Sequence, residues 1–181
     1  YHEYAPLYGG DMRMGVCHPE EALIKHATLF ACGLQNLVGI GEPEYDFEVN
    51  PNYPVLVLIR NICLAQRTYA NPYVVLGQMQ RPAELAVEHE TIDLYRYPGT
   101  VQIPKVLHSV WKSPEGKLGY VLANWTGSPQ VVALTLMAEA GGPISIVTAA
   151  GRRMPNADEL TGATLTLTVP ARDVLLVERE G

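Results

Sequence analysis

The chain has 181 residues, of which 48% are hydrophobic, and carries a formal net charge of -6 at pH 7. This length and apolar content allow a buried core in one large or two small domains, and they exclude a chain that is disordered throughout. The acidic balance argues against nucleic acid as a partner, because phosphate backbones attract clustered cationic side chains.

Membrane and metal partners are not predicted either. No apolar run approaches the roughly 20 residues that a membrane-spanning helix requires, and the first residues lack the basic and apolar regions of a signal peptide. Cys17, Cys32 and Cys63 are odd in number and widely spaced, which indicates neither a disulfide framework nor a zinc site. We therefore expect no cofactor, and the sequence leaves the cellular location open.

Residues 1–18 combine a strand-like tip with a Gly-Gly loop that is too apolar for an idle linker. The tip, Tyr-His-Glu-Tyr, is similar to the end of a strand whose earlier residues lie elsewhere. We therefore expect the chain to be a fragment of a longer protein, or a trimmed one.

Two helices are predicted next. Pro19, followed by two glutamates, suits a helix start, and Gly33 suits its end. A second helix starts at Asn50–Pro54 and ends before Asn71-Pro72. Because the second helix is apolar on many sides, we expect it to pack between layers. In a fragment, residues 55–62 would be left without a partner.

Strands dominate from residue 88 onward. Residues 106–125 contain two runs rich in β-branched and aromatic residues, joined by a polar Ser-Pro-Glu-Gly turn, which predicts a hairpin. Apolar residues occur on both faces of each strand of this hairpin. The hairpin should therefore lie centrally in a sheet that is covered on both faces. In residues 164–169 threonine alternates with leucine and valine, which predicts a strand with one face in the core and one in water. Six or seven antiparallel strands are expected in all.

The order of these pieces resembles the C-terminal end of glycoside hydrolases built from a (β/α)8 barrel and a trailing β-sandwich, above all the α-galactosidase-like and endo-α-N-acetylgalactosaminidase-like enzymes. The motifs that carry the resemblance are YHEY at residues 1–4, RNICLAQRTYANPYVVLGQMQRP at 60–82, HSVWKSPEGKLGYVLANWTG at 108–127 and LTVPARDVLLVE at 167–178.

The resemblance implies an α+β fold in which residues 1–85 are the helical end of the barrel and 86–181 an antiparallel β-sandwich. It also implies that the catalytic carboxylates lie on strand tips upstream of Tyr1, since barrel active sites are built at the C-terminal ends of the strands. No catalytic residue is then expected in this chain, which would complete and support the barrel. Its expected partners are carbohydrate and the remainder of the barrel or another copy of the chain.

Candidate substrate-binding residues lie near the start of the chain. Aromatic rings stack on sugars, and imidazole or carboxylate groups bind hydroxyls. Successive residues of a strand point to opposite sides, so at most half of the tip can face one pocket. His2-Glu3 is not a metalloprotease motif, because Pro6 stands where the second histidine belongs. The candidates are His2, Glu3, Tyr4, Tyr8 and Asp11.

Several residues have a plainer interpretation beside the functional one. Asp11, His18 and His26 match no metal-ligand spacing, and His26 is expected to be solvated or at the edge of the core. Trp111 and Trp125 are expected to pack in the core rather than to form a carbohydrate platform. The glycosylation sequon at Asn124 is attributed to chance.

Two alternatives to the hydrolase interpretation stay open at this stage. One is a non-catalytic carbohydrate-binding module, which would present a row of solvent-facing aromatic side chains. The other is a structural protein in which the helices only cap the sheet.

Overall fold

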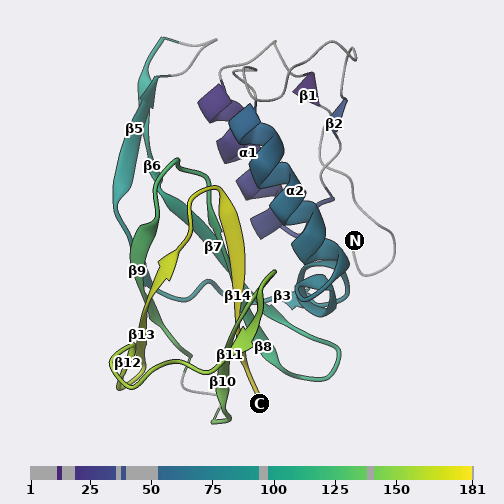
Figure 1. Cartoon of the computed structure of the whole chain (residues 1–181), viewed down its shortest axis with the longest axis vertical. Coiled ribbons are helices and arrows are strands. Elements are labelled where there is room, and N and C mark those ends of the chain that lie inside the picture. Colours follow the sequence, from purple (N-terminus) through teal and green to yellow (C-terminus); the bar gives the residue numbers. More distant parts are fainter. Residues whose placement is uncertain are drawn as a thin grey trace.

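The computed structural model describes residues 12–13, 19–35, 38–39, 53–93, 98–137 and 141–180. These residues form a mostly antiparallel β structure with two α-helices packed against it (Figure 1). Within the described ranges, no helix has the length and apolar character needed to span a membrane.

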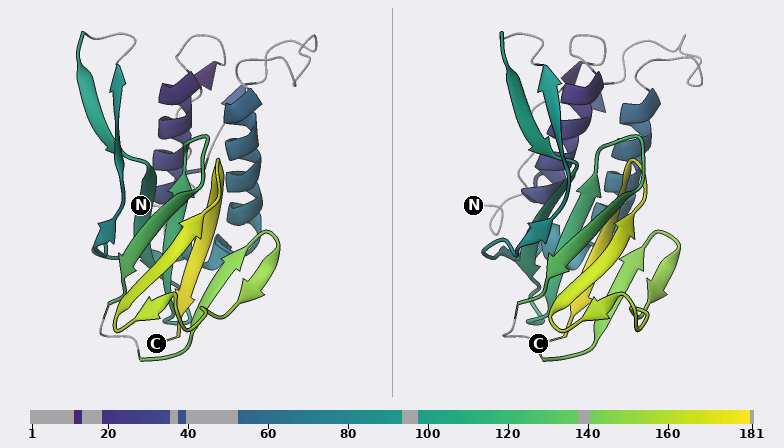
Figure 2. Two further views of the ribbon diagram at one scale, coloured as in Figure 1. Left: turned by 60° about the vertical axis from the view of Figure 1, so that its left-hand side comes forward. Right: turned by 90° about the vertical axis from the view of Figure 1, so that its left-hand side faces the viewer.

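The two α-helices, α1 (Pro19–Ala31) and α2 (Tyr53–Arg67), lie side by side, as Figure 2 shows. Glu20 and Glu21 lie in the first turn of α1. There their carboxylates interact favourably with the positive end of the helix dipole. Gly33 ends this helix with a φ of +70°, a conformation that disfavours residues with a Cβ. Both predicted helices are therefore confirmed, with α2 ending four residues before Asn71.

Two short strands, β1 (Met12–Arg13) and β2 (Val38–Gly39), pair in parallel. The element order is β1-α1-β2-α2, so α1 lies in the crossover that a parallel pair requires. In Figure 1 this pair lies on the side of the helices away from the hairpin of residues 89–104. The sequence shows a short apolar run at residues 37–40, where β2 lies, but no strand pattern at β1.

A π-helical turn, η1 (Asn71–Val75), follows α2, where the sequence showed only a short apolar run. Its signature is the bond from Leu76 N–H to the Asn71 carbonyl at 3.2 Å, which spans five residues. Pro72 is tolerated because it lies at the start of the turn, where its missing N–H is not needed.

The larger sheet has six strands in the order β11-β10-β14-β8-β7-β3. The predicted hairpin is β7–β8, with Val110 opposite Tyr120, and its place near the middle of the sheet is confirmed. The strands of this sheet are β3 (Gln78–Met79), β7 (Val106–Lys112), β8 (Leu118–Asn124), β10 (Ile144–Thr148), β11 (Gly151–Arg153) and β14 (Asp173–Arg179).

The smaller sheet has four strands in the order β12-β13-β9-β4. In β13 the leucines and Val169 are buried while Thr166 and Thr168 are exposed, which confirms the predicted alternation. Its strands are β4 (Leu85–Ala86), β9 (Gln130–Thr135), β12 (Leu160–Thr161) and β13 (Thr164–Val169).

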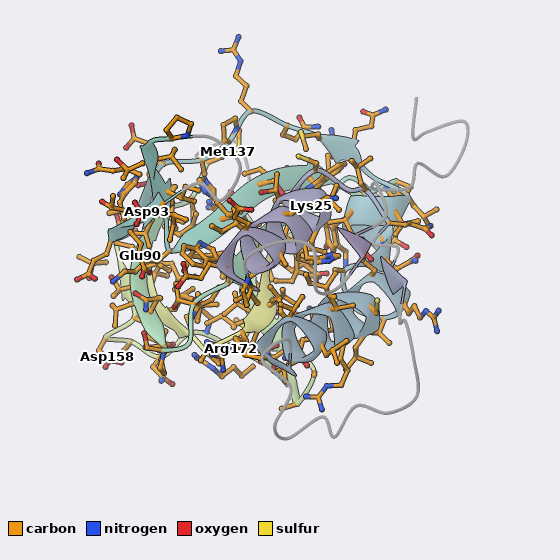
Figure 3. The ribbon with its side chains drawn as sticks, turned by 90° about the horizontal axis from the view of Figure 1, so that it is seen from above. Lys25, Glu90, Asp93, Met137, Asp158 and Arg172 are labelled. Atoms are coloured by element: carbon orange, nitrogen blue, oxygen red, sulfur yellow. The ribbon has the colours of Figure 1, made fainter. Side chains whose placement is uncertain are left out.

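A separate hairpin, β5 (His89–Asp93) and β6 (Thr100–Pro104), extends beyond both sheets (Figure 2). Ile92 is buried near the turn of this hairpin, and at its base the Trp125 indole donates a 2.8 Å hydrogen bond to the Pro104 carbonyl. Seen from above in Figure 3, Glu90 and Asp93 mark this hairpin at the edge of the molecule away from α2.

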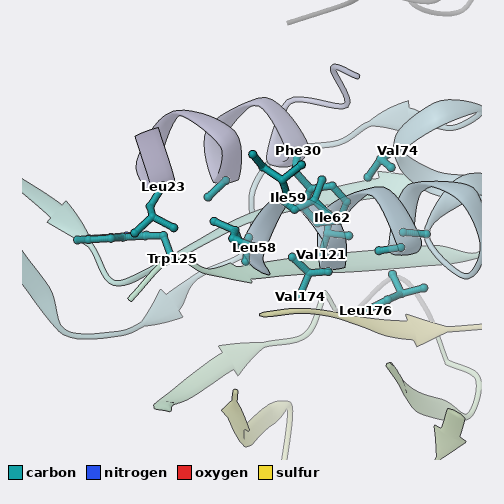
Figure 4. Close-up of a cluster of buried hydrophobic side chains, with 14 of the residues drawn as sticks. Leu23, Phe30, Leu58, Ile59, Ile62, Val74, Val121, Trp125, Val174 and Leu176 are labelled. Atoms are coloured by element: carbon teal, nitrogen blue, oxygen red, sulfur yellow. The ribbon is translucent and has the colours of Figure 1, made fainter. Parts of the chain in front are cut away.

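The described elements form three layers: the helices, the six-stranded sheet and the four-stranded sheet (Figure 2). Alternate side chains of the central strands pack into two different hydrophobic cores, one on each face of the six-stranded sheet. Val121 and Leu176 pack against the helices (Figure 4), whereas Leu122 and Val177 pack against the four-stranded sheet. The prediction that both faces of the β7–β8 hairpin are covered is therefore confirmed.

The packing of α2 gives no support to the expectation that the chain is a fragment, in which residues 55–62 would lack a partner. Val55, Leu58 and Ile62 are fully buried within this chain, in the core that α2 shares with α1 and β14. The reason is that the outer face of the six-stranded sheet is itself apolar and needs the cover that the helices supply.

Candidate functional site

The predicted substrate-binding residues lie outside the described residues. His2, Glu3, Tyr4, Tyr8 and Asp11 all precede Met12, and the structure neither brings them together nor separates them. The same holds for His18. Within the described residues, Arg60 donates to the Asn61 side-chain oxygen at 3.2 Å.

One polar cluster joins the helical layer to the six-stranded sheet. The Tyr73 hydroxyl, in η1, donates a 2.6 Å hydrogen bond to Glu178 Oε2, on β14. The other oxygen of this carboxylate accepts a hydrogen bond from Arg152, on the edge strand β11. Only 9% of the Glu178 side chain is exposed, so this is a nearly desolvated carboxylate with both oxygens engaged.

The environment shifts the pKa of both partners. Burial alone would raise the pKa of Glu178, but the hydrogen bonds from Arg152 and Tyr73 outweigh it and leave this pKa below its ordinary value. Burial, together with the bond to the Glu178 carboxylate, raises the pKa of Tyr73. At neutral pH the cluster therefore holds an ionised carboxylate, a neutral phenol and a guanidinium.

This cluster is suited to holding layers together rather than to glycosidic chemistry. Hydrolysis of a glycosidic bond needs two carboxylates that flank the substrate, one of them free to transfer a proton or to attack. Both oxygens of Glu178 are occupied by protein donors. The sequence held a signal for this position of Glu178. In β14, Glu178 lies on the same strand face as Val174 and Leu176, whose side chains face the helices. Its partner Tyr73 is brought there only by tertiary structure.

Asn124 is a second buried polar centre, and its role is structural. Its amide nitrogen donates to the carbonyls of Ser128, Val169 and Pro170 at 2.9 to 3.1 Å, and its oxygen accepts from Thr126. The side chain is fully buried. In the fold the nitrogen of this sequon is committed to protein carbonyls, in agreement with the interpretation that the sequon is accidental.

The aromatic side chains of the described residues are core residues. Trp111 and Trp125 are 1% and 2% exposed, which confirms the prediction that they pack in the core. Phe30, Tyr73 and Tyr120 are buried as well, and Tyr69 is half-buried. The described part of the chain thus offers no row of solvent-facing rings, the feature that a carbohydrate-binding module would require.

His26 is a correction to the sequence analysis. It was expected to be solvated or at the core edge, but it is fully buried on α1. The reason is that His26 neighbours Ala22, Leu23 and Phe30 on the face of α1 that contributes to the core. Among the described residues, no group of three potential metal ligands comes together.

A surface depression of about 610 Å³ lies between η1 and the β7–β8 turn. Val75, Leu76 and Pro114 form its apolar wall, and Lys112 and Glu115 contribute opposite charges. With one charge of each sign and no aromatic side chain among its lining residues, this depression specifies no ligand class.

Comparisons with known proteins gave structural neighbours only. No protein family matches the sequence, and a search of curated proteins found no match. A glycoside hydrolase family 30 subfamily 8 xylanase from Clostridium acetobutylicum is 10% identical, with a TM-score of 0.48, over 97% of this chain and 43% of that one. A putative α-galactosidase from Bacteroides fragilis is 12% identical, with a TM-score of 0.47, over 95% and 32%.

A third neighbour, an α-amylase from Anoxybacillus, is 10% identical, with a TM-score of 0.45, over 89% of this chain and 32% of that one. This chain thus spans less than half the length of the three proteins. At these identities and TM-scores, the three neighbours assign neither an activity nor a substrate to this chain.

Proposed function

We propose that this chain is the C-terminal part of a barrel-type glycoside hydrolase, in which it completes the barrel wall and supports it with a β-sandwich. The observation that carries the proposal is the order β1-α1-β2-α2 with β1 and β2 in parallel. This is two consecutive β/α units, the repeat from which such barrels are built.

The size of the parallel pair supports a larger parallel sheet. Each strand has two residues, and a two-stranded sheet of this length is not stable by itself in water. Parallel sheets occur almost only with helices on their faces, and here α1 and α2 accompany the pair. Further β/α units beside β1 and β2 would satisfy both requirements.

In this proposal the β-sandwich supports the helices of the barrel wall. Its six-stranded sheet holds α1 and α2 through a shared core, and Asn61 of α2 donates a 2.9 Å hydrogen bond to the Arg172 carbonyl next to β14. The proposed division between barrel and sandwich lies near residues 81–87. Strand β3 precedes that division but pairs with β7, so the two parts are joined by a strand as well as by side chains.

The proposal that the protein is a glycoside hydrolase rests on the sequence resemblance. The hydrolytic activity is proposed for the intact protein and not for residues 1–181 alone. We place no catalytic residue in this chain and no cofactor. His2, Glu3, Tyr4, Tyr8 and Asp11 are proposed to contact the sugar. The proposed partners are a carbohydrate and the remaining β/α units.

The proposal is tested by assaying glycoside hydrolysis for residues 1–181 and for the product of the complete reading frame, on a panel of aryl α- and β-glycosides. We expect activity only in the complete product. There, Glu3→Gln should lower kcat/KM by about tenfold or more, the scale of a lost substrate contact. Thr166→Ala, on the outer face of β13, is the matched control and should leave kcat/KM unchanged. Hydrolysis by residues 1–181 alone, or none by the complete product, would contradict the proposal.

A further inference from the structure

The connection between the helical layer and the six-stranded sheet is a short, fully structured segment, residues 68–77. Within it, Gly77 N–H donates to the Tyr73 carbonyl at 2.8 Å, and the Asn71 amide donates to the Gln66 carbonyl at 2.9 Å. The segment is therefore built as a rigid turn rather than as a flexible linker.

Tyr73 is the largest fully buried side chain of this segment. It is 1% exposed, and its ring lies against Gly119 of β8 so closely that a Cβ at residue 119 would overlap the ring. A Cβ at Gly77 would likewise overlap the Tyr73 and Lys112 carbonyls. Gly119 thus leaves the space that the Tyr73 ring occupies, and Gly77 leaves space for the Tyr73 backbone.

We infer that the Tyr73–Glu178 hydrogen bond is the joint that fixes the helical layer on the six-stranded sheet, with Arg152 extending it to the sheet edge. A shift of the helices relative to β14 would separate a buried phenol from a nearly buried carboxylate and leave both without water. The geometry therefore permits one packing arrangement of the helical layer on the six-stranded sheet. This inference holds whether or not the chain belongs to a glycoside hydrolase.

The charged groups around the joint fix its behaviour with pH. Arg152 and Lys117 act on Glu178, Glu115 acts on Tyr73, and Glu180 acts on Arg152. Because the pKa of Glu178 is lowered in the fold, its stabilisation is present above the ordinary glutamate pKa. It is lost as the pH falls through the lowered pKa.

A double-mutant cycle on residues 1–181 tests the joint. Tyr73→Phe keeps the ring and removes the hydroxyl, and Glu178→Ala removes the carboxylate. Trp111 and Trp125 both lie in the core between helices and sheet, so their fluorescence during urea unfolding reports on this interface. We expect the two substitutions to be coupled by about tenfold or more in the folding equilibrium constant, as for a buried hydrogen bond to a charged group. This coupling should shrink in acid.

Tyr69 provides the matched control in the same segment. Its hydroxyl also crosses between the layers, but it donates to the Val174 carbonyl at 3.0 Å rather than to Glu178. Tyr69→Phe combined with Glu178→Ala should be additive within about twofold. If Glu178→Ala does not fold, Glu178→Gln replaces it, and its coupling to Tyr73→Phe must still exceed that of the Tyr69 control. Additive effects of the Tyr73 and Glu178 substitutions at neutral pH would overturn the inference.

Discussion

Gly33 lies against the indole of Trp111 so closely that a Cβ at residue 33 would come within 2.5 Å of the ring carbon Cη2. The same Cβ would also approach the Val74 carbonyl at 2.8 Å. The end of α1 is therefore seated on β7 at a point where only glycine fits.

Gly33→Ala should thus lower the free energy of unfolding by about 3 kcal/mol, the combined scale of a left-handed alanine and an overpacked contact. Gly162→Ala is the matched control, because Gly162 has a similar φ of +61° but open space around its Cβ position. It should cost only about 1 kcal/mol. Urea unfolding measures both, and equal losses would show that Trp111 does not constrain residue 33.

Two carboxylates at opposite ends of β14 should respond to pH in opposite directions. The pKa of Glu178 is lowered by its two hydrogen-bond donors, whereas burial raises the pKa of Asp173 despite its bond from Val174 N–H and the nearby Arg60. A raised carboxyl pKa makes the fold more stable as the pH falls through that value, which is opposite to the effect of Glu178.

Replacing each carboxylate by its amide separates the two effects. Asp173→Asn should leave stability equal or higher at pH 7 and lose any advantage in acid, while Glu178→Gln should lower stability at pH 7 and flatten the loss in acid. Thermal unfolding from pH 3 to pH 8 gives both profiles. The assignment fails if the profiles change in the same direction.

Asn124→Ala should destabilise the sandwich strongly, because it removes a buried amide that donates to three carbonyls and accepts from Thr126. We expect a loss of about 3 kcal/mol or more in the free energy of unfolding. Asn156→Ala, at an exposed position outside the strands, is the control and should change it by less than about 0.5 kcal/mol. If Asn124→Ala lowers the free energy of unfolding as little as Asn156→Ala does, Asn124 does not have the structural role described here.

Leu58 and Leu64 lie on the same helix but in different surroundings. Leu58 is fully buried between α2 and the sheet, whereas Leu64 is 43% exposed. Leu58→Ala should cost about 3 kcal/mol of stability and Leu64→Ala less than about 1 kcal/mol. Denaturant titration of both variants checks whether α2 packs on this sheet, since similar small losses would mean that it does not.

Local chemistry was enough to predict the regular elements. The Pro-Glu-Glu start of α1, the hairpin β7–β8 and the threonine alternation of β13 each follow from neighbouring residues, and the structure bears them out. Strands of two residues, such as β1 and β2, carry too short a pattern to be recognised in this way.

Relationships across the layers could not be predicted from the sequence. The layer that covers α2 could not be predicted because periodicity shows that a helix face is apolar but not which layer covers it. The partnership of Tyr73 with Glu178 joins residues 105 positions apart and depends on the π turn and on Gly119. The substrate-binding candidates from His2 to Asp11 stay a prediction, since they precede the described residues.

The most direct test of the proposed architecture is an experimental structure of the product of the complete reading frame. Our account predicts that β1 and β2 are the last two strands of a closed parallel barrel, with α1 and α2 held between that barrel and the six-stranded sheet. A structure in which β1 and β2 meet no further parallel strands would contradict it.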